Sequence, residues 1–220
     1  CLAMGKSANN MSVALFGGTF NPIHFGHLNL ASELADYLQV ESVRMLPCAI
    51  PAHRETPNIS AEQRLAMLEL AIDGNPSLVA DDLELKRGDT SYSIDTVGYI
   101  RQAIGLQTPL FFCIGMDALL SIHSWHRWTE LLDYCHIVAC SRPDYELPSN
   151  GVVAKWIDQH LCNDLTQVKK QSHGCLHLCK IPLLDISSTA IRDNIKYEKN
   201  IDHMTSESVV NYIKQHSLYE

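Results

Sequence analysis

The sequence lacks any run of about 18 apolar residues, so no segment is long enough to cross a bilayer as a helix. No apolar stretch follows the basic residue near the N-terminus, so we expect no secretory leader. Internal repeats and low-complexity segments are also missing, which excludes repeat architectures and long biased tracts. These absences predict a cytoplasmic protein without a membrane partner.

Cysteines with metal-binding spacing are missing as well. The eight Cys residues include no C-x2-C pair, and several lie in apolar runs, so we expect reduced thiols that pack as small hydrophobes. One alternating segment does resemble a metal cluster: His173, Cys175, His177 and Cys179. Alternate residues of a strand lie about 6–7 Å apart, too far to surround one zinc ion with ligands at about 2.0–2.3 Å. We therefore expect no protein-bound metal.

Positive charge is scarce: 17 Lys and Arg oppose 25 Asp and Glu, for a formal net charge of -8. Sequence-independent nucleic-acid binding needs Lys and Arg to neutralise phosphates, so we expect no nucleic-acid partner. A small anionic ligand needs only a few cations in one pocket and stays compatible. The 220 residues have globular composition, and we expect a single domain over residues 12–220 after a tail at 1–11, either native or added.

Short apolar runs alternate with helical patterns along the chain. Strands are expected at 13–16, 43–46, 110–114, 137–139 and 175–182, and helices at 24–38, 60–72, 93–104 and 206–216, with further helix starts near 116 and 187. Residues 78–85 alternate weakly, and the weak periodicity of 142–172 suggests an insertion. This order predicts an α/β fold: a Rossmann-like, doubly wound parallel sheet with helices on both faces and a C-terminal helical segment. Ligands of such sheets bind beyond the carboxyl ends of the strands.

The most informative segment follows the first expected strand and reads Gly17-Gly18-Thr19-Phe20-Asn21-Pro22-Ile23-His24-Phe25-Gly26-His27-Leu28. Paired glycines let the backbone approach a ligand, with N–H groups facing phosphate oxygens. His24 and His27, three residues apart at a helix start, share one face near the positive end of the helix dipole. Gly26 between them lowers helix stability by about 1 kcal/mol relative to Ala, which suggests that a flat group must lie against the backbone. The combination favours a phosphate site over two solvated histidines.

A second segment, Ile186-Ser187-Ser188-Thr189-Ala190-Ile191-Arg192, follows the last expected strand. A Ser at a helix start caps the helix, and the free N–H groups of its first turn bind anions. Arg192, one turn further, can reach the same anion with two N–H groups. Alone, this pattern is also that of an ordinary cap with an exposed Arg.

Together, the two segments resemble the H-x-G-H and I-S-S-T-x-I-R signatures of the nucleotidyltransferase superfamily. From about residue 13 to 218, the chain is similar to the bacterial nicotinate-nucleotide adenylyltransferases. The supporting segments are 50–54, 64–72, 91–96, 112–117, Trp125, 131–132 and 140–143. The chain departs from that family at Asn21, where Asp is usual, and at Cys48 and Ala52, where Asn and Pro are more common.

The resemblance implies adenylyl transfer from ATP to nicotinate mononucleotide in NAD biosynthesis, with His24, His27 and Arg192 as catalytic residues. The implied ATP-binding residues are Gly17, Gly18, Thr19, Phe20, Gly26, Gly115, Asp117, Arg142, Ile186, Ser187 and Ser188. The implied nicotinate nucleotide-binding residues are Arg54, Ser93, Trp125 and His126. In this scheme the pyridine ring stacks on the tryptophan, backbone N–H groups near Ser93 and His126 meet its carboxylate, Arg54 helps hold phosphate, and Asp117 serves the ATP ribose.

The expected reaction begins when the 5′-phosphate of the mononucleotide attacks the α-phosphorus of ATP, and pyrophosphate leaves. That phosphate is already anionic, so catalysis needs positioning and charge stabilisation rather than a general base. Mg²⁺ is expected on the ATP phosphates. The alternatives are another acceptor (nicotinamide mononucleotide or phosphopantetheine), a cytidylyl donor, a non-catalytic nucleotide-binding sensor, or a metal-binding structural module. The sequence leaves the oligomeric state open.

Overall fold

The protein is described by a computed structural model that covers residues 12–51, 59–88, 90–141, 147–182 and 184–220. The strands of its central sheet are β1 (Val13–Gly18), β2 (Val43–Pro47), β4 (Leu78–Ala80), β6 (Leu110–Gly115), β7 (His136–Ser141) and β8 (Leu176–Lys180). They lie in the order β4-β2-β1-β6-β7-β8, and all neighbours are parallel. This is the strand order of a doubly wound dinucleotide-binding sheet, so the predicted Rossmann-like fold is confirmed.

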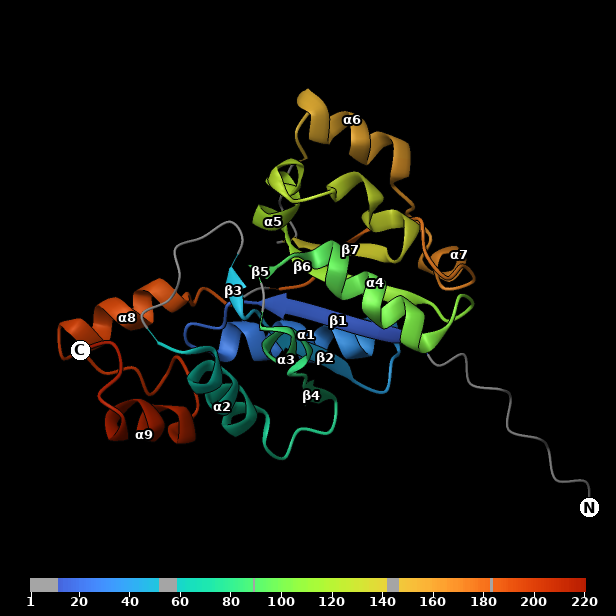
Figure 1. Ribbon diagram of the computed structural model, residues 1–220. Coiled ribbons are helices and arrows are strands. Elements are labelled where there is room, and N and C mark those ends of the chain that lie inside the picture. The colour runs from blue at the N-terminus through green and yellow to red at the C-terminus, as the bar shows by residue number, and fades with distance from the viewer. Residues whose placement is uncertain (1–11, 52–58, 89, 142–146, 183) are drawn as a thin grey trace, which may run out of the picture.

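Helices cover both faces of this sheet (Figure 1). One core lies under α1 (Phe25–Leu38), α2 (Ala61–Ile72), α8 (Ser188–Lys196) and α9 (Glu207–Gln215). The other lies under α4 (Ser93–Ile104), α5 (Met116–Leu120), α6 (Gly151–His160) and the 3-10 helix η2 (Trp128–Asp133). Because side chains alternate along a strand, β1 sends Ala14 and Phe16 into the first core and Leu15 into the second.

Two weakly patterned segments form regular structure. Residues 78–85 form the edge strand β4 and the start of α3 (Leu83–Arg87). The interpretation of residues 142–172 as an insertion is wrong for their described part. There α6 places Trp156 and Ile157 in the second core, and α7 (Leu165–Val168) precedes β8. The segment is thus the crossover that joins parallel β7 and β8. Its helices are short, with ten residues in α6 and four in α7, so neither sustains a long periodic pattern.

The carboxyl ends of β1 and β6 form the switch point of the sheet. After β1 the chain continues into α1 on one face, and after β6 it continues into α5 on the other. A two-stranded sheet of β3 (Ile50–Pro51) and β5 (Thr90–Ser91) lies at the same end, directly before α4. Ligands of doubly wound folds bind in the crevice at such a point. Among the described residues, no helix is both long and apolar enough to span a bilayer.

Candidate active site

His24 and His27 lie together where the chain passes from β1 into α1. His24 is the N-cap of α1, and its Nδ1 accepts the backbone N–H of His27 at 3.4 Å. The two imidazoles stack with ring centroids 3.7 Å apart and an interplanar angle of 26°. The buried Phe20 ring meets His27 edge-on at 5.1 Å. The spacing argument that placed both imidazoles on one face is thus correct in geometry.

Gly26 allows a close approach, although the flat group beside it differs from the expectation. A Cβ at this position would lie 3.0 Å from the His24 ring and 3.4 Å from the carbonyl oxygen of Ile186. The flat group against the backbone is therefore the His24 imidazole, and no ligand is needed to explain this glycine. Gly18 has a comparable reason, because a Cβ there would lie 2.6 Å from the Phe20 ring.

Burial keeps both imidazoles neutral in the chain without ligand. It lowers the pKa of His24 from 6.5 to about 4. It also holds the pKa of His27 well below 6.5, and the neighbouring His24 lowers it further. Within the described structure, Nδ1 of His27 is buried without a hydrogen-bond partner. An anion placed against this pair would favour the protonated forms and raise both pKa values.

The two signature segments contact each other directly. Arg192 donates from one terminal nitrogen to the Asn21 carbonyl oxygen at 2.7 Å and from the other to Thr189 Oγ1 at 3.2 Å. The Ser188 hydroxyl donates to the Pro22 carbonyl oxygen at 2.9 Å. Ser187 caps α8 by accepting the Ala190 N–H at 3.1 Å. The α8 N-terminus and its guanidinium therefore lie beside the histidine pair, as a shared phosphate site requires.

Further contacts from the C-terminal part of the chain hold the segment that connects β1 to α1. Thr205 Oγ1 donates to the Ile23 carbonyl oxygen at 3.0 Å, and the Phe25 N–H donates to the Met204 carbonyl oxygen at 2.9 Å. The Tyr219 hydroxyl donates to Asn21 Oδ1 at 2.8 Å. The sequence did not predict these contacts, because no local pattern of residues indicates them.

Arg64 is a second residue that the sequence interpretation missed. Its side chain is 1% exposed and donates to the carbonyl oxygens of Thr19 at 2.8 Å, Cys48 at 2.7 Å and Ala49 at 3.0 Å. It therefore joins the segment after β1 to the segment after β2. A signal was present, because Arg64 lies on the same helical stripe as the buried Met67 and Leu68. A cation on an apolar stripe indicates an internal partner.

At the end of β6, Gly115 is the N-cap of α5, and Asp117 lies exposed in the first helical turn. Asp117 is not the N-cap of α5, because Gly115 occupies that position. A Cβ built on Gly115 would meet no described atom within 4 Å. Unlike Gly26, this glycine has open space above it, which leaves room for a ligand.

The described residues implied for the nicotinate nucleotide, Ser93, Trp125 and His126, lie on the second face of the sheet. Trp125 is half-buried at the end of η1 (Ile122–Ser124) and meets Phe112 edge-on with centroids 6.3 Å apart. Phe112 in turn lies 3.5 Å from the position of a Cβ on Gly17. The exposed His126 ring lies 4.7 Å from Tyr92, the N-cap of α4. Since α4 begins at Ser93, the contact between Tyr92 and His126 brings the start of α4 close to the segment that follows η1.

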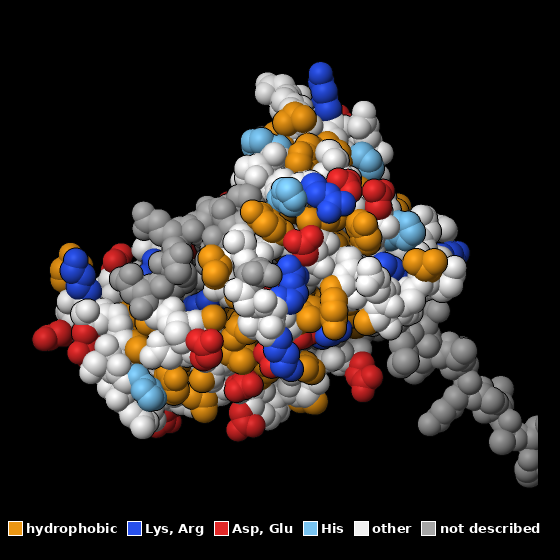
Figure 2. Space-filling model, in the orientation of Figure 1, with side chains coloured by type: hydrophobic (Ala, Val, Ile, Leu, Met, Phe, Trp, Pro, Cys, Tyr) orange, Lys and Arg blue, Asp and Glu red, His pale blue; other side chains and the backbone are white. Residues whose placement is uncertain are grey.

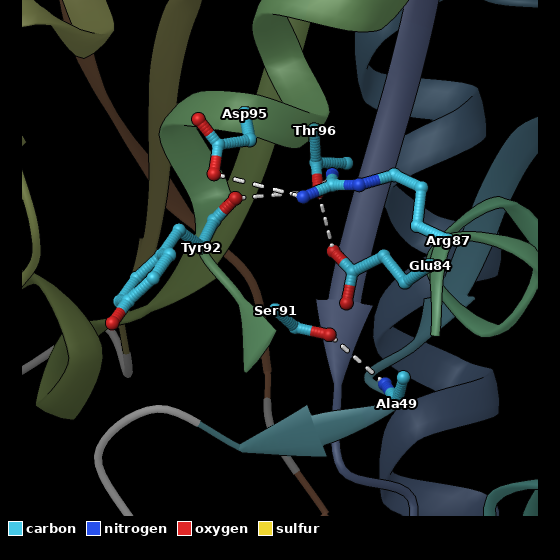
Figure 3. A network of polar contacts seen from close by, with 7 residues as sticks. All are labelled: Ala49, Glu84, Arg87, Ser91, Tyr92, Asp95 and Thr96. Atoms are coloured by element: carbon cyan, nitrogen blue, oxygen red, sulfur yellow. Dashed lines mark hydrogen bonds and ion pairs between the residues drawn. The ribbon is translucent and has the colours of Figure 1, made fainter. Parts of the chain in front are cut away.

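A polar network fixes the start of α4 (Figure 3). The Ser91 hydroxyl accepts the Ala49 N–H at 2.9 Å, which ties β5 to the segment after β2. Thr96 Oγ1 donates to the buried carboxylate of Glu84 at 2.8 Å and accepts from Arg87 at 3.2 Å. Burial raises the pKa of Glu84, while hydrogen bonds from Ser91 and Thr96 oppose that shift. The start of α4, where Tyr92 contacts the His126 ring, is thereby held in place.

The alternating His and Cys segment is explained by packing. His177 shares a hydrogen bond of 2.8 Å with the Tyr37 hydroxyl through Nε2 and one of 2.7 Å with the Cys162 carbonyl oxygen through Nδ1. Cys179 is fully buried in the first core. Within the described ranges, no group of three or more His, Cys, Asp or Glu could hold a metal ion, and all seven described cysteines are free thiols.

Arg54, the implied phosphate contact, and Arg142, an implied ATP-binding residue, lie outside the described residues. On the face drawn in Figure 2, described Lys and Arg side chains lie scattered among Asp and Glu rather than in one basic stripe. The described cations on that face therefore form no continuous basic surface.

Comparison with known proteins agrees with this geometry. Residues 15–194 match the cytidylyltransferase-like family model. A protein of Yersinia pestis (strain Pestoides F) named probable nicotinate-nucleotide adenylyltransferase is 41% identical over 218 residues, covering 97% of this chain and 98% of its own. One of the same name from Serratia proteamaculans (strain 568) is 43% identical over 207 residues, covering 94% of each.

Among solved structures, a Plasmodium falciparum nicotinic acid mononucleotide adenylyltransferase complexed with NaAD superposes with a TM-score of 0.72. It shares 17% identity and covers 94% of this chain and 97% of its own. The same Plasmodium enzyme complexed with APC gives a TM-score of 0.71, also at 17% identity, over 95% and 97% of the two chains. At such identities these likenesses support the fold.

Proposed function

The chain belongs to the nicotinate-nucleotide adenylyltransferases of the cytidylyltransferase-like family, and we propose that it transfers the adenylyl group of ATP to nicotinate mononucleotide. The observation that carries this proposal is the contact between the two signature segments, in which Arg192 donates to the Asn21 carbonyl oxygen. That contact supports a site at the carboxyl end of β1 to which a helix N-terminus, a guanidinium and two imidazoles contribute. Such a set of donors suits a polyphosphate.

In this proposal, the triphosphate of ATP lies between the histidine pair and the N-terminus of α8. The glycines of the β1 end, Gly17 and Gly18, let the backbone approach it, and Thr19, Phe20 and Gly26 shape the same wall. The ATP ribose lies above the open space at Gly115, within reach of the exposed Asp117. Ser187 and Ser188 supply backbone N–H donors at the start of α8, and Ile186 leads into that helix. Arg142 is proposed as a further contact from the family resemblance alone.

The mononucleotide lies on the other side of β1. Trp125 is half-buried, so it offers part of its ring for stacking on a pyridinium while its edge contacts Phe112. The N–H groups near Ser93 and His126 are proposed to bind the ring carboxylate, since a helix N-terminus favours an anion. A nicotinamide ring carries no charge at that position, which is the physical basis for preferring the acid. Arg54 is proposed as a phosphate contact from the resemblance.

The reaction requires no covalent enzyme intermediate. An oxygen of the mononucleotide 5′-phosphate bonds to the α-phosphorus of ATP while the bond to the bridging β-phosphate oxygen breaks, and pyrophosphate leaves. His24 and His27 donate hydrogen bonds to the phosphates, and Arg192 balances the charge that develops on the leaving group. Mg²⁺, which takes oxygen ligands, is proposed to arrive on ATP, because the described residues include no group of three or more His, Cys, Asp or Glu that could hold a metal ion.

A side-by-side turnover assay tests the proposal. Pyrophosphate release is measured with nicotinate or nicotinamide mononucleotide as acceptor, and with ATP or CTP as donor. We expect the highest kcat/KM for the pair of ATP and nicotinate mononucleotide. Faster release with the amide or with CTP would assign the chain another substrate, and Mg–ATP binding without any release would identify a nucleotide-binding sensor.

A further inference from the structure

The end of the chain, residues 217–220, folds back toward the β1–α1 connection, and the C-terminus lies beside α8 in Figure 1. After α9 ends at Gln215, Ser217 and Tyr219 both take left-handed conformations, with φ values of 48° and 70°. Residues other than glycine keep such conformations where tertiary contacts impose them. Leu218 between them is buried in the first core, so packing anchors this turn.

The turn delivers the Tyr219 hydroxyl to Asn21 Oδ1, with a donor–acceptor distance of 2.8 Å. The Tyr219 ring packs against the first core, and burial raises the pKa of its phenol, so the hydroxyl keeps the proton it donates. The same Asn21 presents its carbonyl oxygen to Arg192 at 2.7 Å. The chain end and α8 therefore hold the two oxygens of a single residue.

Asn21 is well placed to transmit this contact. It lies three residues before His24 and directly before Pro22, whose carbonyl oxygen accepts the Ser188 hydroxyl. Tyr219 and Arg192 also share the wall of an open hollow of about 470 Å³. A shift of Asn21 would move the acceptor of Arg192 and the start of α1 together.

We propose that Tyr219 is a positioning residue for the triphosphate of ATP, because through Asn21 it holds the turn that anchors the Arg192 guanidinium and leads into His24. The inference rests on the proposed function for the identity of this ligand. Both Asn and Asp offer an oxygen at the position that accepts the hydroxyl. The departure from the family pattern at Asn21 therefore preserves the contact while removing a negative charge beside Arg192.

The Tyr219→Phe variant removes the hydroxyl and keeps the ring. By calorimetry on the full chain, we expect its dissociation constant for Mg–ATP to rise about fivefold, as for one lost hydrogen bond, and that for nicotinate mononucleotide to change less than about twofold. The dissociation constant for inorganic pyrophosphate should rise by a similar factor, because pyrophosphate binds where the β- and γ-phosphates of ATP bind. The matched control is Tyr99→Phe, whose side chain is 56% exposed on α4, and it should change none of these constants.

Variants of Asn21 test whether Tyr219 acts through it. Asn21→Ala removes the acceptor, so adding Tyr219→Phe to that variant should weaken Mg–ATP binding no further. Asn21→Asp keeps an acceptor oxygen, so adding Tyr219→Phe to it should again weaken binding about fivefold.

The proposal is overturned if Tyr219→Phe leaves Mg–ATP binding unchanged, or if it weakens both substrates equally while the melting temperature falls. Additive losses in the Asn21→Ala background would also overturn it. Binding constants keep this test separate from turnover. A chain that binds Mg–ATP with the expected dependence on Tyr219 but releases no pyrophosphate contradicts the proposed function alone, whereas a chain that binds neither Mg–ATP nor pyrophosphate contradicts both.

Discussion

His24 and His27 have an environment that surface histidines lack. Each ring covers the other, and Phe20 closes the edge of the pair. Burial lowers both pKa values, so the free chain presents neutral imidazoles that can donate without first losing a hydration shell. Preorganised donors of this kind stabilise charge that develops in a transition state more effectively than mobile, solvated groups.

Substitution of His27 tests this role at the level of a single side chain. We expect His27→Ala to lower kcat about 100-fold or more, the effect of removing one preorganised donor. The control is His123→Ala, on the exposed part of η1, which should retain wild-type turnover. Near wild-type kcat in a folded His27→Ala chain would remove His27 from the catalytic set.

At the scale of elements, the N-termini of helices position most of the site residues. Ser60 and Gln63 form a capping box with bonds of 3.0 and 3.2 Å, and it sets the start of α2. From that helix Arg64 reaches back to the segments after β1 and β2. Helices α1 and α8 begin at His24 and Ser187, so their N-termini converge on one site.

Gly26 allows a test on α1 itself. In an ordinary helix, Gly→Ala adds about 1 kcal/mol of stability, but here the new Cβ would lie 3.0 Å from the His24 ring. We therefore expect Gly26→Ala to displace His24 and lower kcat at least about tenfold, without the gain in melting temperature. The matched control is Gly98→Ala in α4, where the nearest atom, on Tyr134, is 3.7 Å away. It should keep full turnover and melt at the same or a higher temperature.

At the scale of the whole molecule, the site is assembled from both ends of the chain. The strand order places β1 in the middle of the sheet, between β2 and β6. The first core then joins α1 to α8 and α9, so the C-terminal segment packs beside the segment that follows β1. His24 is buried in this arrangement and also belongs to the site. The stability of the fold and the geometry of the site therefore both depend on it.

Acid should therefore destabilise the whole chain. The pKa of His24 and of His136 is about 4 in the folded chain against an ordinary 6.5, and that of His27 is also lowered. Between these two values the unfolded chain binds more protons, so the free energy of unfolding falls as pH is lowered through that window. The raised pKa of Glu84 opposes this trend with a single group.

Melting curves recorded between pH 7 and pH 4 measure the effect. We expect the melting temperature to fall steadily below about pH 6.5, the ordinary pKa of histidine, and to fall less steeply in His24→Gln. His123→Gln, at an exposed position, should follow the wild-type slope. A flat profile through this window would contradict the burial of neutral histidines.

Much of this protein was determined by its sequence. Periodicity of neighbouring residues was enough to predict the alternation of strands and helices and hence the doubly wound sheet, because those patterns are local. Both signature segments can also be recognised in the sequence, because their chemistry depends on spacings of a few residues, as between His24 and His27. The pattern of residues 142–172 is weak because α6 and α7 have only ten and four residues, too few for a sustained helical period.

Tertiary structure alone decided which residues hold the site together. The bonds from Arg64 to Thr19, from Thr205 to Ile23 and from Tyr219 to Asn21 span 45, 182 and 198 positions. Local spacing contains no information on such partners, because the strand order and the two cores bring them together. Gly26 illustrates the difference between sequence and tertiary structure. The sequence shows that a glycine lies in the helix, but only the packing of His24 and Ile186 explains why a larger residue would not fit.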